Sequence, residues 1–293
     1  MTERHRAILG LVCVAAVWGA SFTAVKAALV HTSPLVLLAL RFLAAAALVL
    51  PLWRGITRRE LLAGAVVGLL FWGGFVFQTS GLAVTTPSRA AFITGLSTPL
   101  TPVVALLACR AAPGLPTAAG IAVATLGTWL LVRPEGGGPL NRGDLLTIGC
   151  AVLFAGQIVA AGHYAPRARI ERLLVVELTL TGALSLLAAP LLETPRLELR
   201  PGLLPLVAFL AISGAGTFYY QLRGQRVVGP SQAALIFLAE PVVAAVTSYL
   251  LLGERLTAVQ WLGAALILAA MALPELAPAA AGRDDRNPLS LPG

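Results

Sequence analysis

Charged residues are scarce in this sequence. Asp, Glu, Lys and Arg together make up 12% of its 293 residues, while 58% are hydrophobic. A soluble globular chain typically carries about 25% charged residues to cover its surface. Lysine occurs only once, so nearly all of the positive charge behind the net charge of +8 comes from arginine. The shortage of charge excludes a soluble domain and favours an integral membrane protein.

Cysteine is also rare, and the common catalytic patterns are missing. Cys13, Cys109 and Cys150 have neither the number nor the spacing of a disulfide framework or a zinc site. The sequence contains no GxSxG, HExxH, phosphate-binding-loop or dinucleotide-binding pattern. We therefore expect no catalytic residues, no metal and no cofactor. The lack of a nucleotide-binding loop also argues against a primary pump.

What the sequence does have is long apolar runs, each able to cross a bilayer as a helix of about 20 residues. Barrel strands would alternate apolar and polar residues, and these runs do not. The sequence therefore predicts an all-α integral membrane protein with ten transmembrane helices, the first of them uncleaved. The expected spans are 7–27, 34–53, 61–81, 89–108, 116–133, 144–163, 172–192, 203–222, 231–252 and 256–274.

The sequence contains an internal repeat. Ten of the 21 residues in 73–93 are identical to those in 216–236 at a constant shift of 143, including Gln, Gly, Pro and Ser positions that apolar composition alone would not align. We expect a first five-helix half over 1–133, a linker over 134–143, a second half over 144–274 and a disordered tail over 275–293. Because five is odd, the second half would enter the membrane from the opposite face, giving an inverted repeat with a site between the halves.

The distribution of arginine predicts the orientation. With a cytoplasmic N-terminus, thirteen Lys and Arg residues fall on the cytoplasmic side and seven on the other. The positive-inside rule then places both termini in the cytoplasm and the protein in the cell membrane. The arginines lie in loops without interleaved aromatic residues, which argues against nucleic-acid binding.

Several short motifs follow one another along the whole chain in a characteristic order and spacing. They are WGASF (18–22), Arg41-Phe42, PSRAAFITGLSTPLTP (87–102), and the stretch 230–268 with Glu240-Pro241 and Gly253-Glu254. Together they resemble the EamA-type carriers of the drug/metabolite transporter superfamily. The resemblance implies ten helices and transport of small metabolites, often outward, without identifying the solute. One departure is that Arg110-Ala111 stands opposite Gly253-Glu254, so the first half lacks the acidic turn.

Two charged residues are expected inside spans, where charge is costly and usually faces a cavity or a partner. Glu240 is either a coupling or solute-contacting group, or a structural carboxyl that pairs with an arginine or caps a break at Pro241. Arg41 either holds a carboxylate solute or forms an ion pair with Glu240, and structural pairing is favoured. Glu177 is expected to reach water near the cytoplasmic end of its span.

Polar and aromatic residues suggest where a solute would bind. The repeat-related Gln78 and Gln221 should lie at equivalent depths, either facing a cavity or joining helices by hydrogen bonds. Neighbouring aromatic residues favour the cavity, because small-molecule sites have apolar walls with few polar groups. The expected solute-binding residues are Trp18, Ser21, Gln78, Gln157, Tyr219 and Gln221.

Prolines interrupt the fourth and ninth spans. Pro99, Pro102 and Pro241 are expected to act as hinges, the alternative being static kinks. Gly64 and Gly68 permit close helix approach, which we expect within one chain, although a homodimer stays open.

The predicted function is that of a secondary transporter. It would move a small metabolite, such as an amino acid, a related compound or a drug-like solute, across the cytoplasmic membrane by alternating access. The expected direction is export, driven by the solute gradient or by protons, and the expected partners are lipid, solute and protons. The alternative is a membrane-embedded enzyme or a receptor-like scaffold without transport activity.

Overall fold

The structure is a computed structural model that describes residues 2–85, 87–132, 141–252 and 257–276. Most of the expected linker, the Gly253-Glu254 turn and nearly all of the expected tail lie outside the described residues. The described residues fold into helices, with one isolated β-bridge between Thr32 and Leu197.

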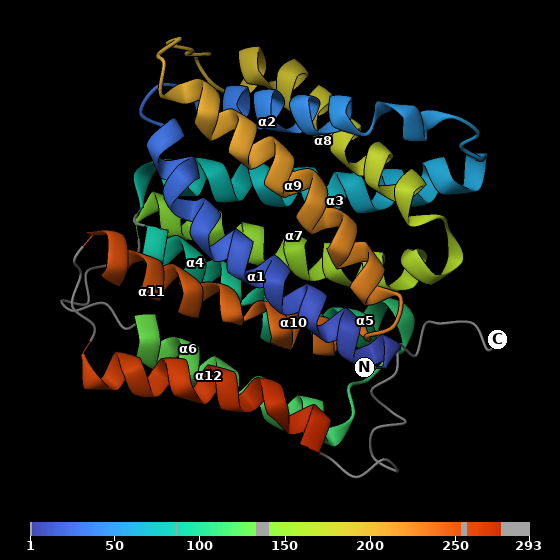
Figure 1. The fold of residues 1–293 in the computed structure, drawn as a ribbon, viewed down its shortest axis with the longest axis vertical. Helices are drawn as coiled ribbons and strands as arrows, with labels where there is room; N and C mark the ends of the chain where they lie inside the picture. Colours follow the sequence, from blue (N-terminus) through green and yellow to red (C-terminus); the bar gives the residue numbers. More distant parts are fainter. Residues whose placement is uncertain (1, 86, 133–140, 253–256, 277–293) are drawn as a thin grey trace.

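The helices follow one another in the same order in the two halves of the chain (Figure 1). The first half contains α1 (Glu3–Ala28), α2 (Pro34–Leu48), the 3-10 turn η1 (Leu50–Trp53), α3 (Arg58–Val84), α4 (Pro87–Gly95), α5 (Ser97–Cys109) and α6 (Leu115–Val132). The second contains α7 (Arg142–Tyr164), the 3-10 turn η2 (Ala165–Arg167), α8 (Ile170–Leu192), α9 (Leu203–Gln225), α10 (Pro230–Phe237), α11 (Ala239–Leu252) and α12 (Ala258–Leu276). When the residue numbers of the first half are raised by 143, each helix from α1 to α6 overlaps its counterpart among α7 to α12.

Much of this helical structure is apolar and long enough to cross a membrane. Seven segments of the described chain meet both conditions, with α4–α5 and α10–α11 each counted as one segment. Three further apolar segments are shorter, namely Pro34–Leu48 of α2, Leu115–Leu131 of α6 and Ala258–Pro274 of α12. The protein is therefore an all-helical, multi-pass membrane protein.

The fourth and ninth expected spans are each divided in two, as the prolines predicted. Pro99 and Pro241 lack the N–H that would bond to the carbonyl four residues earlier. Those carbonyls belong to Gly95 and Phe237, the residues at which α4 and α10 end. Pro102, in contrast, lies inside α5, which continues to Cys109. α5 is not broken at Pro102, although Pro102 was expected to act as a hinge. A helix packed in a bundle tolerates the loss of one backbone hydrogen bond.

Two pairs of corresponding helices, α2 with α8 and α6 with α12, lie side by side and run in opposite directions. α6 and α12 approach each other closely at glycines. A Cβ atom at Gly120 would lie 2.9 Å from the carbonyl oxygen of Ala270, and a Cβ atom at Gly127 would lie 2.8 Å from the carbonyl oxygen of Gly263. Residue numbers therefore rise along α6 as they fall along α12. The same holds for α2 and α8, where Leu35 contacts Glu193 and Leu43 contacts Gly182. These pairs occupy the two ends of the view in Figure 1.

The two halves are packed into one another rather than standing as separate bundles. α3 packs against α7 and α8, and its counterpart α9 packs against α1 and α2, the counterparts of α7 and α8. Gly64 and Gly68 of α3 lie against Val176 and Leu180 of α8. The close approach expected at these glycines is therefore confirmed within one chain.

The start of α7 carries a buried carboxylate that joins the halves. Asp144 accepts a hydrogen bond from Thr85 Oγ1 at 3.0 Å, and Arg89 Nη2 lies 2.7 Å from its Oδ2. It also caps α7 together with Asn141, whose side chain accepts from the Asp144 backbone N–H at 3.0 Å. Asp144 thus ties α7 to the end of α3 and the start of α4.

Replacing Asp144 with Ala should lower the free energy of unfolding by about 2 kcal/mol, because it removes a cap and hydrogen bonds to a buried charge. The measurement is the thermal unfolding midpoint of the detergent-solubilised protein. Glu198→Ala is the matched control, since Glu198 and Arg196 form an exposed ion pair at 3.4 Å, which contributes little. Equal midpoints for the two variants would contradict this role for Asp144.

Candidate functional site

A cavity lies between the two halves, with residues of both on its walls. Its volume is about 80 Å³. Its described polar and charged lining residues are Trp18, Ser21, Arg41, Gln78, Thr94, Ser97, Gln157, Ser213, Thr217, Gln221 and Glu240. The structure therefore brings together five of the six expected solute-binding residues, together with Arg41 and Glu240.

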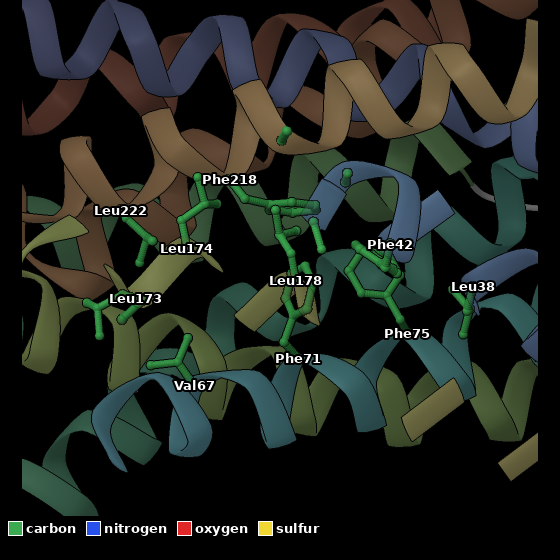
Figure 2. Close-up of a cluster of buried hydrophobic side chains, with 14 of the residues drawn as sticks. Leu38, Phe42, Val67, Phe71, Phe75, Leu173, Leu174, Leu178, Phe218 and Leu222 are labelled. Carbon is green, nitrogen blue, oxygen red and sulfur yellow. The ribbon is translucent and has the colours of Figure 1, made fainter. Parts of the chain in front are cut away.

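Aromatic rings form much of the cavity wall. The Trp18 ring centroid lies 5.5 Å from that of Phe218 and 5.0 Å from that of Phe237. Phe75 lines the same cavity, and Figure 2 shows Phe75 and Phe218 within the cluster of buried side chains. The Trp18 indole N–H donates to Thr217 Oγ1 at 3.0 Å, which fixes the ring. Apolar walls with a few placed polar groups are typical of small-molecule sites.

Tyr219 does not join this wall. Its ring lies beside that of Tyr220, with centroids 5.5 Å apart, and it packs at the edge of the hydrophobic cluster. Each helical residue is rotated by about 100° from the one before it. Phe218 and Gln221, three residues apart, therefore share the face of α9 that meets the cavity, and Tyr219 points away. The expectation for Tyr219 as a lining residue was wrong.

Arg41 is a buried cation on the cavity wall. Its guanidinium carbon lies 4.4 Å from the ring centroid of Phe42 and 4.5 Å from that of Phe75. Stacking of this kind stabilises a partly desolvated guanidinium. Within the described part of the chain, no carboxylate forms an ion pair with it, so the expected pair with Glu240 is not seen. The donors of Arg41 stay available to a solute.

Glu240 lies in the first turn of α11, just after the break at Leu238. It is 8% exposed, and no hydrogen bond or ion pair joins its carboxyl to another described residue. The start of a helix favours negative charge, because its free N–H groups carry partial positive charge. The carboxyl is thus placed where it can meet a cationic or hydrogen-bond-donating group.

The repeat-related glutamines both line the cavity but have different partners. Gln78 donates to Thr94 Oγ1 at 3.4 Å and is half-buried. Gln221 is 1% exposed and donates to Gln157 Oε1 at 3.0 Å. The sequence left open whether these glutamines face a cavity or join helices by hydrogen bonds. Gln221 does both, because it lines the cavity and donates to Gln157 on another helix.

Glu177 does not reach water, contrary to expectation. Its side chain is fully buried, and Gln157 Nε2 donates to its Oε1 at 2.9 Å. Glu177 lies close to the expected cytoplasmic end of its span, which suggested that its side chain would reach water. In the structure, α2, α3 and α9 pack around α8 and cover Glu177.

Thr94, Ser97, Ser213 and Thr217 also line the cavity and were not predicted. Two signals in the sequence could have found three of them, and neither applies to Thr94. Ser97 corresponds to Glu240 at the shift of 143, and Ser213, Thr217 and Gln221 recur every four residues along one face of α9. In the described chain, no group of three or more His, Cys, Asp or Glu residues is arranged to hold a metal ion.

The sequence profile of the EamA-like transporter family matches the chain twice, over residues 5–133 and 141–274. This chain belongs to the EamA-like transporter family. An uncharacterized transporter of Archaeoglobus fulgidus is 32% identical over 279 residues, which cover 94% of this chain and 87% of that protein. The uncharacterized inner membrane transporter YicL of Salmonella typhimurium is 32% identical over 230 residues, covering 74% of this chain and 73% of that protein.

A crystal structure of another protein has the same fold, with a TM-score of 0.76 at 21% identity, over 92% of this chain and 98% of that one. The membership establishes a multi-pass membrane transporter built from two copies of the EamA unit. It is consistent with the expectation of a protein that is not an enzyme, since the family and the named relatives are transporters.

Proposed function

We propose that this EamA-like protein is a secondary carrier that moves a small amino-acid-like metabolite across the cytoplasmic membrane by alternating access. The observation that carries the proposal is a pair of charged side chains, Arg41 and Glu240, on the wall of an otherwise apolar cavity, neither with a charge partner among the described residues. A zwitterion supplies a carboxylate for Arg41 and an ammonium for Glu240, and its apolar part fits the aromatic wall. Such a match offsets the cost of burying both charges.

The proposal includes ten membrane spans arranged as an inverted repeat, with both termini in the cytoplasm. It is supported by the antiparallel pairing of α2 with α8 and of α6 with α12, because corresponding helices of inverted halves must run in opposite directions. The predicted cytoplasmic side carries Arg169, which donates to Glu60 Oε1 at 2.8 Å. The carboxylate of Glu60 raises the pKa of Arg169 above its usual value, so the Arg169 side chain stays positively charged.

Alternating access requires the cavity walls to move. A cavity of about 80 Å³ is smaller than the 300–1,000 Å³ of typical ligand pockets. An amino acid would therefore enter only after a rearrangement. The breaks at Leu96 and Leu238 stand at almost equivalent places in the two halves and are natural positions for hinges. We propose that the net direction is export, as in many EamA-type carriers.

The proposal is tested by counterflow in liposomes that contain the purified protein. Liposomes preloaded with an unlabelled amino acid are mixed with a trace of the labelled form, across a panel of amino acids, their decarboxylated amines and drug-like cations. We expect saturable accumulation of at least one amino acid and none in empty liposomes. Equal signals from protein-containing and empty liposomes across the panel would contradict a carrier.

A further inference from the structure

A second carboxyl, outside the cavity, is buried without a cation. Glu177 is 0% exposed, and its Oε2 is buried with no hydrogen-bond partner among the described residues. Leu174 and Leu178, neighbours on α8, belong to the apolar cluster in Figure 2. An isolated carboxylate in such surroundings is costly, so the neutral acid is the favoured form in this conformation.

Two amides connect this carboxyl to the cavity. Gln157 donates to Glu177 Oε1 at 2.9 Å, and Gln221 donates to Gln157 Oε1 at 3.0 Å. Both glutamines line the cavity, whereas Glu177 does not. The chain of hydrogen bonds finishes at Gln221 Oε1, a buried acceptor without a described partner. A solute in the cavity that carries an N–H or O–H group would supply the missing donor.

No charged group of the surrounding elements neutralises Glu177 within the described chain. Glu60 on α3 is already paired with Arg169, and Arg41 on α2 stacks on Phe42 and Phe75. None of the titratable or charged groups on the helices around Glu177 forms an ion pair or hydrogen bond with it. These groups are Arg41 on α2, Arg58, Arg59 and Glu60 on α3, Arg142, Asp144, Cys150, His163 and Tyr164 on α7, and Tyr219, Tyr220 and Arg223 on α9.

We propose that Glu177 is a proton-binding site controlled from the cavity through Gln221 and Gln157. A donor that binds Gln221 Oε1 polarises its amide and strengthens both hydrogen bonds along the chain. The stronger bond to Oε1 stabilises the carboxylate, so the carboxyl O–H ionises when the rearrangement that lets the solute enter admits water, which takes up the proton. Binding a solute and holding a proton therefore oppose each other, and the effect is reciprocal. The inference rests on the proposed carrier function and makes it a proton-for-solute exchange.

Infrared difference spectroscopy of the purified protein tests the site directly. The C=O stretch of a protonated carboxyl has its own band, which shifts in D₂O. We expect Glu177→Gln to remove one such band and Glu240→Gln to leave it in place. In Gln157→Leu the band should persist to higher pH than in the wild type, because the amide that stabilises the carboxylate is gone. An unchanged pH profile in Gln157→Leu would overturn the relay even if Glu177→Gln failed to fold.

A matched pair of probes tests the control by the cavity. Phenethylamine carries an aromatic ring and an ammonium that donates hydrogen bonds, and phenethyltrimethylammonium has the same charge without an N–H. Of the two probes, we expect only phenethylamine to reduce the intensity of the Glu177 band. Its affinity should rise about tenfold per pH unit while Glu177 is protonated, and this dependence should vanish in Glu177→Gln.

Three results would overturn the proposal: no response of the band to phenethylamine, equal responses to both probes, or loss of the pH dependence in Glu240→Gln instead. These measurements need no flux. A band that responds as expected in a protein without counterflow would therefore contradict the carrier while leaving the proton site intact.

Discussion

Replacing Arg41 with Leu should weaken binding of an amino-acid solute by tenfold or more. Arg41 is the one cation among the described lining residues of the cavity. A hydrogen bond to a charged group contributes about 1.5–3 kcal/mol, which corresponds to a tenfold to roughly 150-fold change in affinity. The measurement is the half-saturation concentration in counterflow. Arg41→Lys should recover part of the loss, because lysine keeps the charge but not the planar, two-pronged donor set.

The control for Arg41 is the decarboxylated amine of the same solute. Because the amine has no carboxylate, Arg41→Leu should leave its binding unchanged or improve it. Arg59→Leu, at an exposed position at the start of α3, should affect neither compound. An equal loss for the amino acid and its amine would mean that Arg41 shapes the cavity and does not bind the carboxylate.

Replacing Gly263 with Ala should destabilise the fold strongly, because the added methyl group meets backbone atoms of α6. A Cβ atom at Gly263 would lie 2.5 Å from the carbonyl oxygen of Gly127 and 2.5 Å from the backbone nitrogen of Leu131. Neither backbone atom can move without separating α6 from α12. Overpacking typically costs about 1–3 kcal/mol, and contact with two backbone atoms places this site at or above the upper end. We expect the thermal unfolding midpoint to fall by about 10 °C.

Gly216→Ala is the matched control for this substitution. It adds the same methyl group and the same gain in helix propensity to α9, where an added Cβ meets nothing within 4 Å. Its midpoint should equal or slightly exceed that of the wild type. If the two alanine variants unfold at the same temperature, the close approach of α6 to α12 does not hold the halves together.

Much of the fold followed from the repeat in the sequence. The shift of 143 predicted that Gln78 and Gln221 would occupy equivalent places, and both line the cavity. The prolines predicted that two spans would be divided. A proline has no N–H to donate to the carbonyl four residues earlier, so the helix is weakened at a known position. Which proline ends a helix depends on the packing around it, so Pro99 and Pro102 could not be told apart.

The parts of the site that escaped prediction depend on side chains from different helices. Glu177 is buried because other helices cover it, and its distance from the end of its own helix gave the opposite expectation. Arg41 and Glu240 both face the cavity, yet only the packing of α2 against the second half decides whether they pair. Tyr219 was misplaced for a simpler reason, since helical periodicity from Phe218 already turns it away from the cavity.

We propose that one cavity opens in turn to the two faces of the membrane. It is tested by replacing Ser21, a half-buried lining residue, with Cys in a variant whose Cys13, Cys109 and Cys150 are replaced by Ser. A membrane-impermeant thiol reagent is applied to one face of oriented vesicles at a time. We expect labelling from each face, with both rates reduced by a transported solute. Labelling from one face only, with or without solute, would contradict alternating access.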